Sequence, residues 1–273
     1  MTIDTHAHLN FNAYKDDADE VIRRSLDNNV WMINVGSTYE TSKRAVRIAE
    51  KYDAGVYAAI GLHPIHLAEG IFKAKLDTEE ISFQAKEEEF DYSKYKDLAQ
   101  SKKVVAVGEI GFDYYYRPKT RLKLEEFKKK QRETFLKQLD LAKELNLPVI
   151  FHCRMANEEL IEILKQCHGE IKGVIHCFFG SWQQAEKYLE MGFYLGFNGI
   201  IFKLNLDETI EKAPLGRILI ETDCPYLTPP PITGRNEPIY ARYVVERIAK
   251  IKKLNLDKVA EITTENAKKV FNI

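Results

Sequence analysis

The chain begins Met1-Thr2-Ile3-Asp4-Thr5-His6-Ala7-His8, a short apolar and β-branched run that ends in two histidines. Such a run is typical of a buried β-strand. Seven similar runs follow along the chain, and longer stretches with helical periodicity separate them. We therefore predict strands at residues 1–6, 30–35, 56–61, 104–108, 147–152, 173–176, 193–197 and 218–221.

The helical stretches between these runs decide how the strands connect. We predict helices at residues 16–29, 41–52, 122–145, 157–167, 182–191 and 207–212, with two more near 239–253 and 257–271. Strands that alternate with helices form a parallel sheet, because each parallel crossover needs a helix. Eight units favour a closed barrel, and 273 residues is near the length of about 250 that is typical of it. The predicted fold class is α/β, a (β/α)8 TIM barrel in one domain over residues 1–273.

One segment is longer than a barrel crossover needs. Residues 67–100 include the charged run Lys86-Glu87-Glu88-Glu89. We interpret this segment as a solvated, peripheral helical insertion. A lid over the active site is the alternative.

Composition limits the classes of function. The 40 basic and 41 acidic residues give a net charge of −1, which argues against a protein that coats nucleic acid through bulk charge but leaves room for a local basic groove. The four cysteines form no C-x-x-C pair, so we expect reduced thiols in the cytoplasm. No apolar run approaches the roughly 18 residues that a membrane span needs. We expect neither a membrane association nor a signal peptide.

Candidate metal ligands stand at the ends of five predicted strands. His6 and His8 are two residues apart in a strand, so they face the same way and can bind a metal ion together. The alternative is a hydrogen-bonded pair of core histidines. Acidic or imidazole side chains also end four other strands, at the face where barrel enzymes place their active sites. The predicted metal ligands are His6, His8, Glu109, His152, His176 and Asp223.

Other chemically active residues lie beside these ligands. His63, in Gly61-Leu62-His63-Pro64, ends the third strand and is expected to hold substrate or act as an acid; a hydrogen-bonded loop histidine is the alternative. Three cysteines each follow a proposed ligand, so strand alternation predicts that they face outward and bind no metal: Cys153, Cys177 and Cys224.

Taken together, the motifs resemble those of the TatD family of metal-dependent deoxyribonucleases over essentially the whole chain. The resemblance rests on Asp4-Thr5-His6-Ala7-His8, Gly61-Leu62-His63-Pro64, Gly108-Glu109-Ile110-Gly111-Phe112-Asp113-Tyr114, His152-Cys153-Arg154, His176-Cys177-Phe178-Phe179-Gly180, Glu221-Thr222-Asp223-Cys224-Pro225-Tyr226 and Gly234-Arg235-Asn236-Glu237-Pro238. It implies the same six metal ligands, with none missing. The insertion after His66 departs from the family and puts the shape of the substrate entrance in doubt.

One or two divalent metal ions are the expected cofactors. Imidazoles with carboxylates suit zinc or manganese better than magnesium, although availability can override this preference. We expect His6, His8 and Asp223 around one ion, His152 and His176 around the other, and Glu109 as a bridge. Asp223 is then expected to orient and deprotonate the attacking water.

The expected substrate is DNA, single-stranded or at an end, because the resemblance implies phosphodiester hydrolysis of exonuclease type. Residues 117–132 hold eight basic and two acidic side chains and follow Tyr114-Tyr115-Tyr116. Binding of a single strand requires positive charge that attracts phosphates and aromatic rings on which bases stack. The alternative interpretation of this stretch is a solvated helix face. We expect His63, Arg154, Tyr114 and Asn236 to contact substrate.

The sequence implies no obligate protein partner. A metal-dependent ester or amide hydrolase, such as an aminoacyl-tRNA deacylase, is the second candidate, and a nonenzymatic metal-stabilised scaffold is a distant third.

Overall fold

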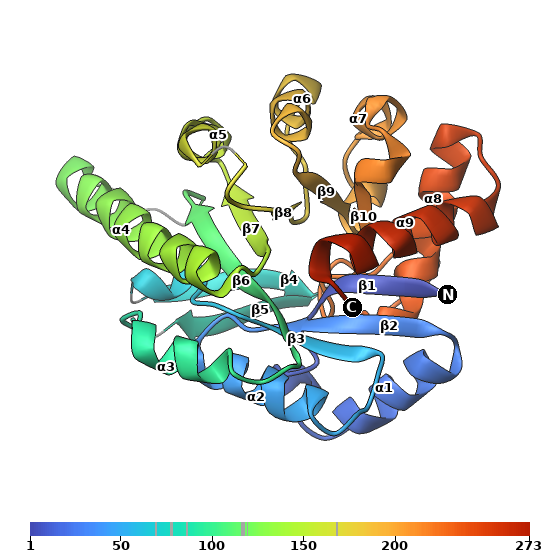
Figure 1. Cartoon of the computed structure of the whole chain (residues 1–273), viewed down its shortest axis with the longest axis horizontal. Coiled ribbons are helices and arrows are strands. Elements are labelled where there is room, and N and C mark those ends of the chain that lie inside the picture. Colours follow the sequence, from blue (N-terminus) through green and yellow to red (C-terminus); the bar gives the residue numbers. More distant parts are fainter. Residues whose placement is uncertain (69, 77–78, 86, 116–117, 119, 168) are drawn as a thin grey trace.

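A computed structural model describes the chain except for residues 69, 77–78, 86, 116–117, 119 and 168, and for residues 70–85 it describes the backbone alone (Figure 1). Its main sheet has eight strands in the order β1-β2-β3-β6-β7-β8-β9-β10, and each hydrogen-bonded neighbour is parallel. The strands are β1 (Thr2–Ala7), β2 (Val30–Val35), β3 (Val56–Ile60), β6 (Val104–Asp113), β7 (Val149–Arg154), β8 (Gly173–Ile175), β9 (Tyr194–Phe197) and β10 (Ile218–Ile220).

The first and last strands of this sheet approach each other just beyond the end of β10. Ala7 and Cys224 form a parallel bridge, and the amide of Asp223 donates to the carbonyl of His6 at 2.8 Å. The amide of His8 donates to the carbonyl of Cys224 at 2.9 Å. The sheet is therefore a nearly closed barrel, which confirms the predicted (β/α)8 TIM-barrel fold class.

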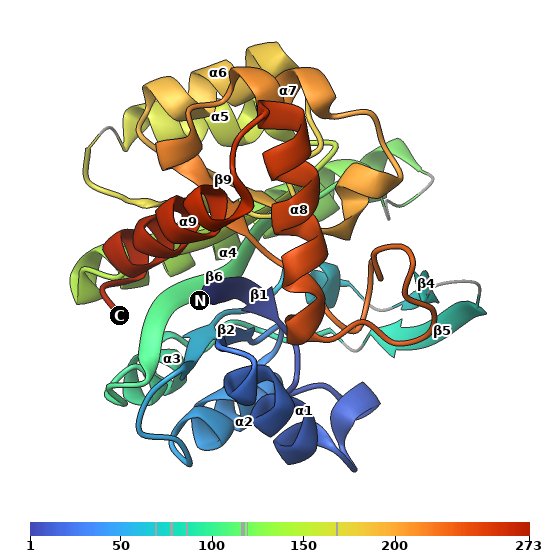
Figure 2. The same cartoon turned by 90° about the vertical axis from the view of Figure 1, so that its right-hand side faces the viewer.

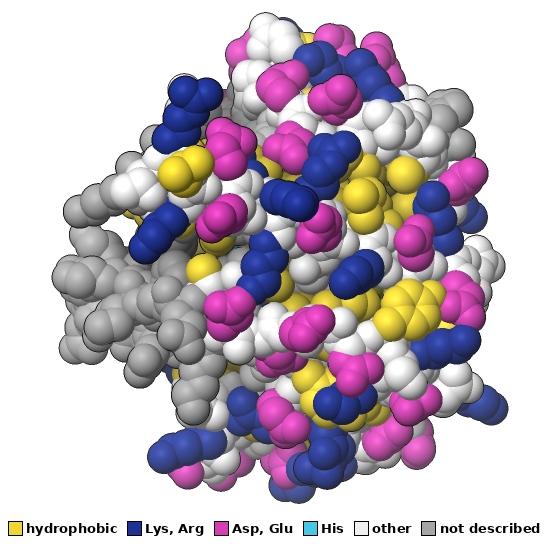
Figure 3. Space-filling view, turned by 90° about the vertical axis from the view of Figure 1, so that its left-hand side faces the viewer, with side chains coloured by type: hydrophobic (Ala, Val, Ile, Leu, Met, Phe, Trp, Pro, Cys, Tyr) yellow, Lys and Arg dark blue, Asp and Glu magenta, His cyan; other side chains and the backbone are white. Residues whose placement is uncertain are grey.

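Helices cover the outside of the barrel (Figures 1 and 2). They are α1 (Ala18–Asp27), α2 (Tyr39–Ala49), α3 (Tyr92–Leu98), α4 (Arg121–Leu145), α5 (Asn157–Gln166), α6 (Trp182–Glu190), α7 (Asp207–Lys212), α8 (Ala241–Lys252) and α9 (Leu256–Phe271). Among the described residues, no helix has the length and apolar character that crossing a membrane requires. On the side of α4, basic and acidic side chains alternate over the surface (Figure 3).

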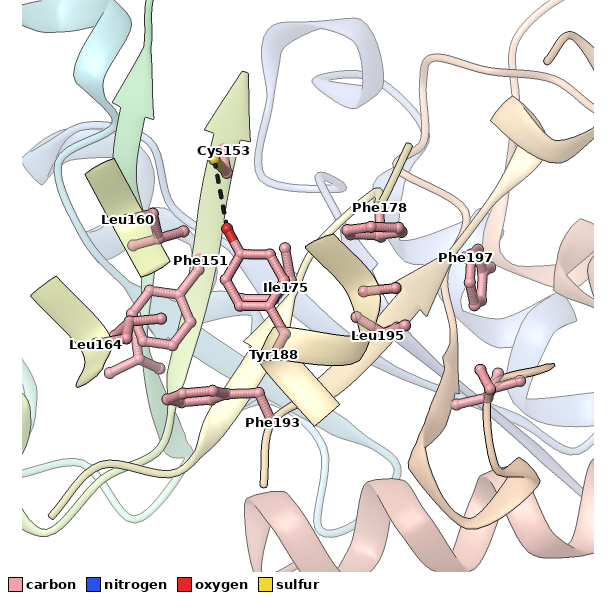
Figure 4. Packing of buried hydrophobic residues seen from close by; sticks show 14 of the residues in the cluster. Phe151, Cys153, Leu160, Leu164, Ile175, Phe178, Tyr188, Phe193, Leu195 and Phe197 are labelled. Atoms are coloured by element: carbon pink, nitrogen blue, oxygen red, sulfur yellow. Dashed lines mark hydrogen bonds between the residues drawn. The ribbon is translucent and has the colours of Figure 1, made fainter. Parts of the chain in front are cut away.

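The core has an inner and an outer layer, as strand alternation requires. One buried cluster takes residues from every strand of the barrel together with the end of α9, so it fills the interior: Ile3, Ile33, Val35, Ala59, Val105, Ala106, Ile150, Val174, Tyr194, Leu219, Ala267, Val270 and Phe271. The larger outer cluster lies between the strands and the helices, where Phe151 and Tyr188 pack beside Cys153 (Figure 4).

The segment at residues 67–100 differs from its prediction. Its first part is a two-stranded antiparallel hairpin, β4 (Gly70–Leu76) and β5 (Glu79–Ala85), so the prediction of a helical insertion was wrong there; the helix α3 follows it. The hairpin leaves the barrel after β3 and returns where the amide of Glu88 donates to the carbonyl of His66 at 2.8 Å. The hairpin therefore begins and ends near the carboxyl end of β3.

Candidate metal centre

The predicted ligands converge at the carboxyl ends of the barrel strands. His6 lies in β1, Glu109 in β6 and His152 in β7. His176 directly follows β8, and Asp223 directly precedes Cys224, which forms the bridge to β1. Their nitrogen and oxygen atoms form overlapping groups in which all atoms lie within 4.8 Å of one another. The structure thus brings together side chains from strands far apart in the sequence.

The first group consists of His6, His8 and Asp223. His8 Nδ1 lies 2.8 Å from the carbonyl of Val35, so this nitrogen donates and the Nε2 lone pair faces inward. That Nε2 lies 3.1 Å from His6 Nε2 and 3.3 Å from Asp223 Oδ1. Two imidazole nitrogens and a carboxylate oxygen that face one point are the donor set that a divalent cation needs, so these residues fit a metal ion.

Glu109 lies at the centre of the cluster and is 4% exposed. Its Oε2 is 3.4 Å from His6 Nε2, whereas its Oε1 is 2.5 Å from His152 Nδ1 and 3.8 Å from His176 Nε2. The two carboxylate oxygens of Glu109 therefore face two different sets of histidines.

The electrostatics of the cluster favour a bound cation. Burial alone would raise the pKa of Glu109, but the surrounding histidines hold it well below its ordinary range. Burial likewise opposes the charge on His152, yet Glu109 and Asp113 raise the pKa of this imidazole to about 9. Burial and the neighbouring His176 lower the pKa of His6 to about 4. Ionised carboxylates thus hold protons on nearby imidazoles, and a divalent cation would displace those protons.

Two carboxylates that the sequence analysis did not single out support the histidines. Asp113 Oδ2 lies 3.3 Å from His152 Nε2, and Glu221 Oε2 lies 2.8 Å from His176 Nδ1. Both carboxylates are buried. Strand alternation could have identified Asp113, because it lies four residues after Glu109 and hence on the same face of β6.

Glu221 fixes the orientation of His176. Besides the imidazole, Oε2 accepts the amide hydrogen of Cys177 at 2.9 Å, and Nε2 of His176 is left to face the cluster. A side chain at Gly196 would collide with the Glu221 carboxylate, so the close approach of β9 requires glycine there.

Replacing Glu221 by glutamine is expected to lower metal affinity about 10–100-fold, because the neutral amide polarises and orients His176 less well. Competition between the protein and a chromogenic zinc chelator measures this affinity. Glu237→Gln is the control, because Glu237 is also buried but pairs with Arg24. An affinity for Glu221→Gln equal to that of the control would contradict the orienting role.

The four residues predicted to contact substrate lie in two different environments. His63 and Arg154 lie at the mouth, with His63 Nε2 3.6 Å from Glu109 Oε1 and the Arg154 guanidinium 3.7 Å above the ring of Tyr115. Asn236 is 0% exposed and its amide donates to the carbonyls of Thr222 and Tyr226.

The predicted contacts of Asn236 and Tyr114 with substrate need correction. Asn236 holds the turn that carries Asp223, and no part of it reaches the mouth. Tyr114 is 5% exposed, lies in the outer core, and donates its hydroxyl to Glu159 at 2.6 Å. Its neighbour Tyr115 is 53% exposed.

The cysteines follow their prediction with one exception. Cys153 and Cys224 are buried in the hydrophobic clusters outside the barrel. Cys177 instead lies with His176 and Asp223 in a group that could hold a metal ion, so its predicted outward orientation was wrong. Its backbone has a φ of 44°, which breaks the alternation of the strand. Burial raises the pKa of the Cys177 thiol well above its ordinary value, so it remains protonated and is a poor ligand.

Known proteins resemble this chain over its whole length. A family model described as TatD related DNase matches residues 3–272. The uncharacterized metal-dependent hydrolase YabD of Bacillus subtilis is 42% identical over 279 residues, covering 100% of both chains. The 3'-5' ssDNA/RNA exonuclease TatD of Shigella flexneri is 30% identical over 281 residues, with 99% of this chain and 98% of that protein covered.

A solved structure agrees with these sequence matches. YJJV, a TatD homologue from Escherichia coli K12, superposes with a TM-score of 0.83 at 29% identity and covers 100% of this chain and 98% of its own. The fold, the ligand cluster and the matches lead to one conclusion. The chain belongs to the TatD related DNase family and is a metal-dependent hydrolase.

Proposed function

We propose that this hydrolase is a deoxyribonuclease of exonuclease type that cleaves phosphodiester bonds at an end of single-stranded DNA. The observation that carries the proposal is the Glu109 carboxylate, whose two oxygens face two sets of histidines at the mouth of the barrel. Paired metal sites of this kind are common in nucleases and phosphatases. The name of the Shigella relative, a single-strand exonuclease, supports the substrate class.

The residues present fit two divalent ions, zinc or manganese before magnesium because most donors are imidazoles. His6, His8 and Asp223 would hold one ion, His152 and His176 the other, and Glu109 would contact both. When bound, the metal would lower the pKa of a water molecule and stabilise negative charge on the reacting phosphate.

The side chains of the chain supply the remaining steps. Asp223 orients the attacking water and accepts its proton; 17% of its side chain is exposed at the mouth. His63 donates a hydrogen bond to the phosphate or the leaving oxygen. Arg154 binds a phosphate oxygen with its guanidinium.

The proposal is tested with protein loaded with zinc or manganese and with single strands labelled at the 5′ or the 3′ end. Stepwise release of nucleotides from one end is the expected result. Hydrolysis of an aminoacyl ester without cleavage of DNA would overturn the proposal in favour of the ester or amide hydrolase. Absence of both activities in metal-loaded protein would favour the scaffold.

The lysines of α4 are expected to assist DNA binding. Replacing Lys128, Lys129 and Lys130 by glutamate is expected to raise KM for DNA several-fold at low salt and to flatten its salt dependence, because phosphate contacts release counterions. The expected rise in KM is only several-fold because acidic neighbours already offset part of this positive charge: Lys129 lies 3.8 Å from Glu133, and Lys130 pairs with Glu87. KM measured over a salt series checks this. Arg117 and Lys119, which belong to the predicted basic stretch, lie outside the described residues.

A charge-matched control separates a local contact from a change in net charge. Glutamates in place of the exposed Lys172, Lys258 and Lys269 make the same change at positions outside α4 and are expected to leave the salt dependence near that of the parent protein. Equal effects of the two triple variants would mean that the α4 lysines belong to a solvated helix face, as the alternating charges on this side suggest (Figure 3).

A further inference from the structure

Exposed apolar side chains follow one another along the rim of the barrel. Tyr115 is 53% exposed, Met155 58%, Phe179 36% and Leu204 45%. They lie in the segments that follow β6, β7, β8 and β9, which are consecutive neighbours in the sheet (Figure 1). These four residues, the rim arc, therefore line one side of the mouth. Apolar side chains left exposed together at one rim mark a binding site more often than side chains scattered over the surface do.

The rim arc begins next to the metal ligands. The amide of Tyr115 donates to Asp113 Oδ1 at 2.9 Å, and the same carboxylate contacts His152 through Oδ2. Phe179 follows His176 by three residues. A ligand on the rim arc would consequently extend from the point where the reaction occurs.

Met155 keeps its exposed position at a cost in backbone energy. Its φ of 58° is in the left-handed region, which is unfavourable for a residue with a Cβ atom. Such conformations concentrate at functional sites. This turn directly follows Arg154 in the chain, whose guanidinium lies over the ring of Tyr115.

Beyond Leu204 the rim opens into a groove of about 770 Å³. One wall is the segment after β9, another is α8, and a third is Pro230-Pro231 of the loop that also carries Asp223. Phe202 and Tyr243 line it together with Lys203 and Lys250. The acidic Asp207 and Glu246 also line the groove, and Asp207 pairs with Arg247 at 2.6 Å, so the two lysines supply its excess of positive charge. The groove thus offers faces for ring stacking and cations for phosphate.

We propose that the rim arc and this groove form the track on which unpaired bases of a single strand lie while its end is cleaved. This inference rests on the proposed nuclease function. Apolar and aromatic side chains accept the face of any base, and basic residues beside them attract the backbone. Bases within a duplex are covered by their neighbours, so the track favours single strands. A peptide would gain little binding energy from this surface, because the surface starts at a site that binds a phosphodiester.

The track is tested with Tyr115→Ala, Phe179→Ala and Leu204→Ser in the full, metal-loaded chain. The substrates are a short single-stranded oligothymidylate, a strand with the same backbone that lacks bases, and bis(p-nitrophenyl) phosphate. Tyr115→Ala and Phe179→Ala are each expected to raise KM for oligothymidylate about tenfold more than they raise KM for bis(p-nitrophenyl) phosphate. The strand without bases is expected to bind the parent protein as weakly as oligothymidylate binds the variants.

Two control variants make the result specific. Leu256→Ala removes an apolar side chain that is 44% exposed on α9, outside the rim arc, and is expected to behave as the parent protein. Tyr115→Phe keeps the ring and is expected to restore most of the affinity lost in Tyr115→Ala.

The outcomes separate the track from the function. Cleavage of oligothymidylate with unchanged KM in the variants, or equal KM for the strand without bases, would overturn the track alone. Hydrolysis of the small phosphodiester by a parent protein that neither binds nor cleaves oligothymidylate would overturn both the track and the nuclease function. Failure of Tyr115→Phe to restore affinity would show that the ring is not the contact.

Discussion

Replacing Glu109 by alanine is expected to remove bound metal and to lower phosphodiester hydrolysis about 10³-fold or more. The carboxylate faces His6 with one oxygen and His152 with the other, so its loss takes a ligand from both proposed sites. Metal ions contribute several kcal/mol to the stabilisation of such transition states, and each 1.4 kcal/mol corresponds to about a tenfold change in rate. Metal analysis by mass spectrometry, together with turnover on bis(p-nitrophenyl) phosphate, measures both effects.

Two further variants separate charge from volume. Glu109→Gln preserves the packing of this buried position but removes the negative charge, so it is expected to lose metal as well. Glu133→Ala removes an exposed carboxylate on α4 and is expected to retain both metal and turnover. Full metal stoichiometry in Glu109→Ala would contradict the assignment of Glu109 as a bridge.

The convergence of the proposed metal ligands in one cluster could be predicted because two simple rules determine the positions of these side chains. Side chains two residues apart in a strand share a face, which pairs His6 with His8. The carboxyl ends of parallel strands meet at one end of a barrel, which brings Glu109, His152 and His176 together. Neither rule needs a distance between side chains, so the sequence alone was sufficient.

The remaining parts of the site depend on where strands end and how far side chains reach. The strand predicted at residues 104–108 continues as β6 to Asp113, so Asp113 faces the cluster and Tyr114 turns into the outer core. The roles of Glu221 and Asn236 follow from hydrogen bonds to residues that are distant across the barrel or within a folded loop. The hairpin in the insertion does carry a strand signal, because Phe72, Ala74 and Leu76 alternate with lysines. It was missed because the charged run at residues 86–89 was interpreted as part of a helix.

His63 lies among the ligands, yet its hydrogen bonds give it a different role. Its Nδ1 accepts the amide hydrogen of Ile65 at 3.0 Å, so in the neutral imidazole the proton is on Nε2. Burial and the nearby His152 lower the pKa of His63, which favours this neutral form. A protonated Nε2 is a hydrogen-bond donor and not a metal ligand. Although His63, Glu109 and His152 could geometrically surround an ion, we expect His63 to donate to the substrate.

Replacing His63 by alanine is therefore expected to lower turnover about 100-fold while metal content is retained, since loss of one positioned hydrogen-bond donor to developing negative charge costs roughly 10²–10³ in rate. Turnover on DNA and metal content measured on the same preparation check this. His63→Gln keeps an amide donor near the same place and is expected to recover part of the activity. His66→Ala, in the short 3-10 helix that His63 caps, is the matched histidine control. Loss of metal from His63→Ala would show that the set of ligands is incomplete, because a donor that binds only substrate has no effect on the affinity for the ion.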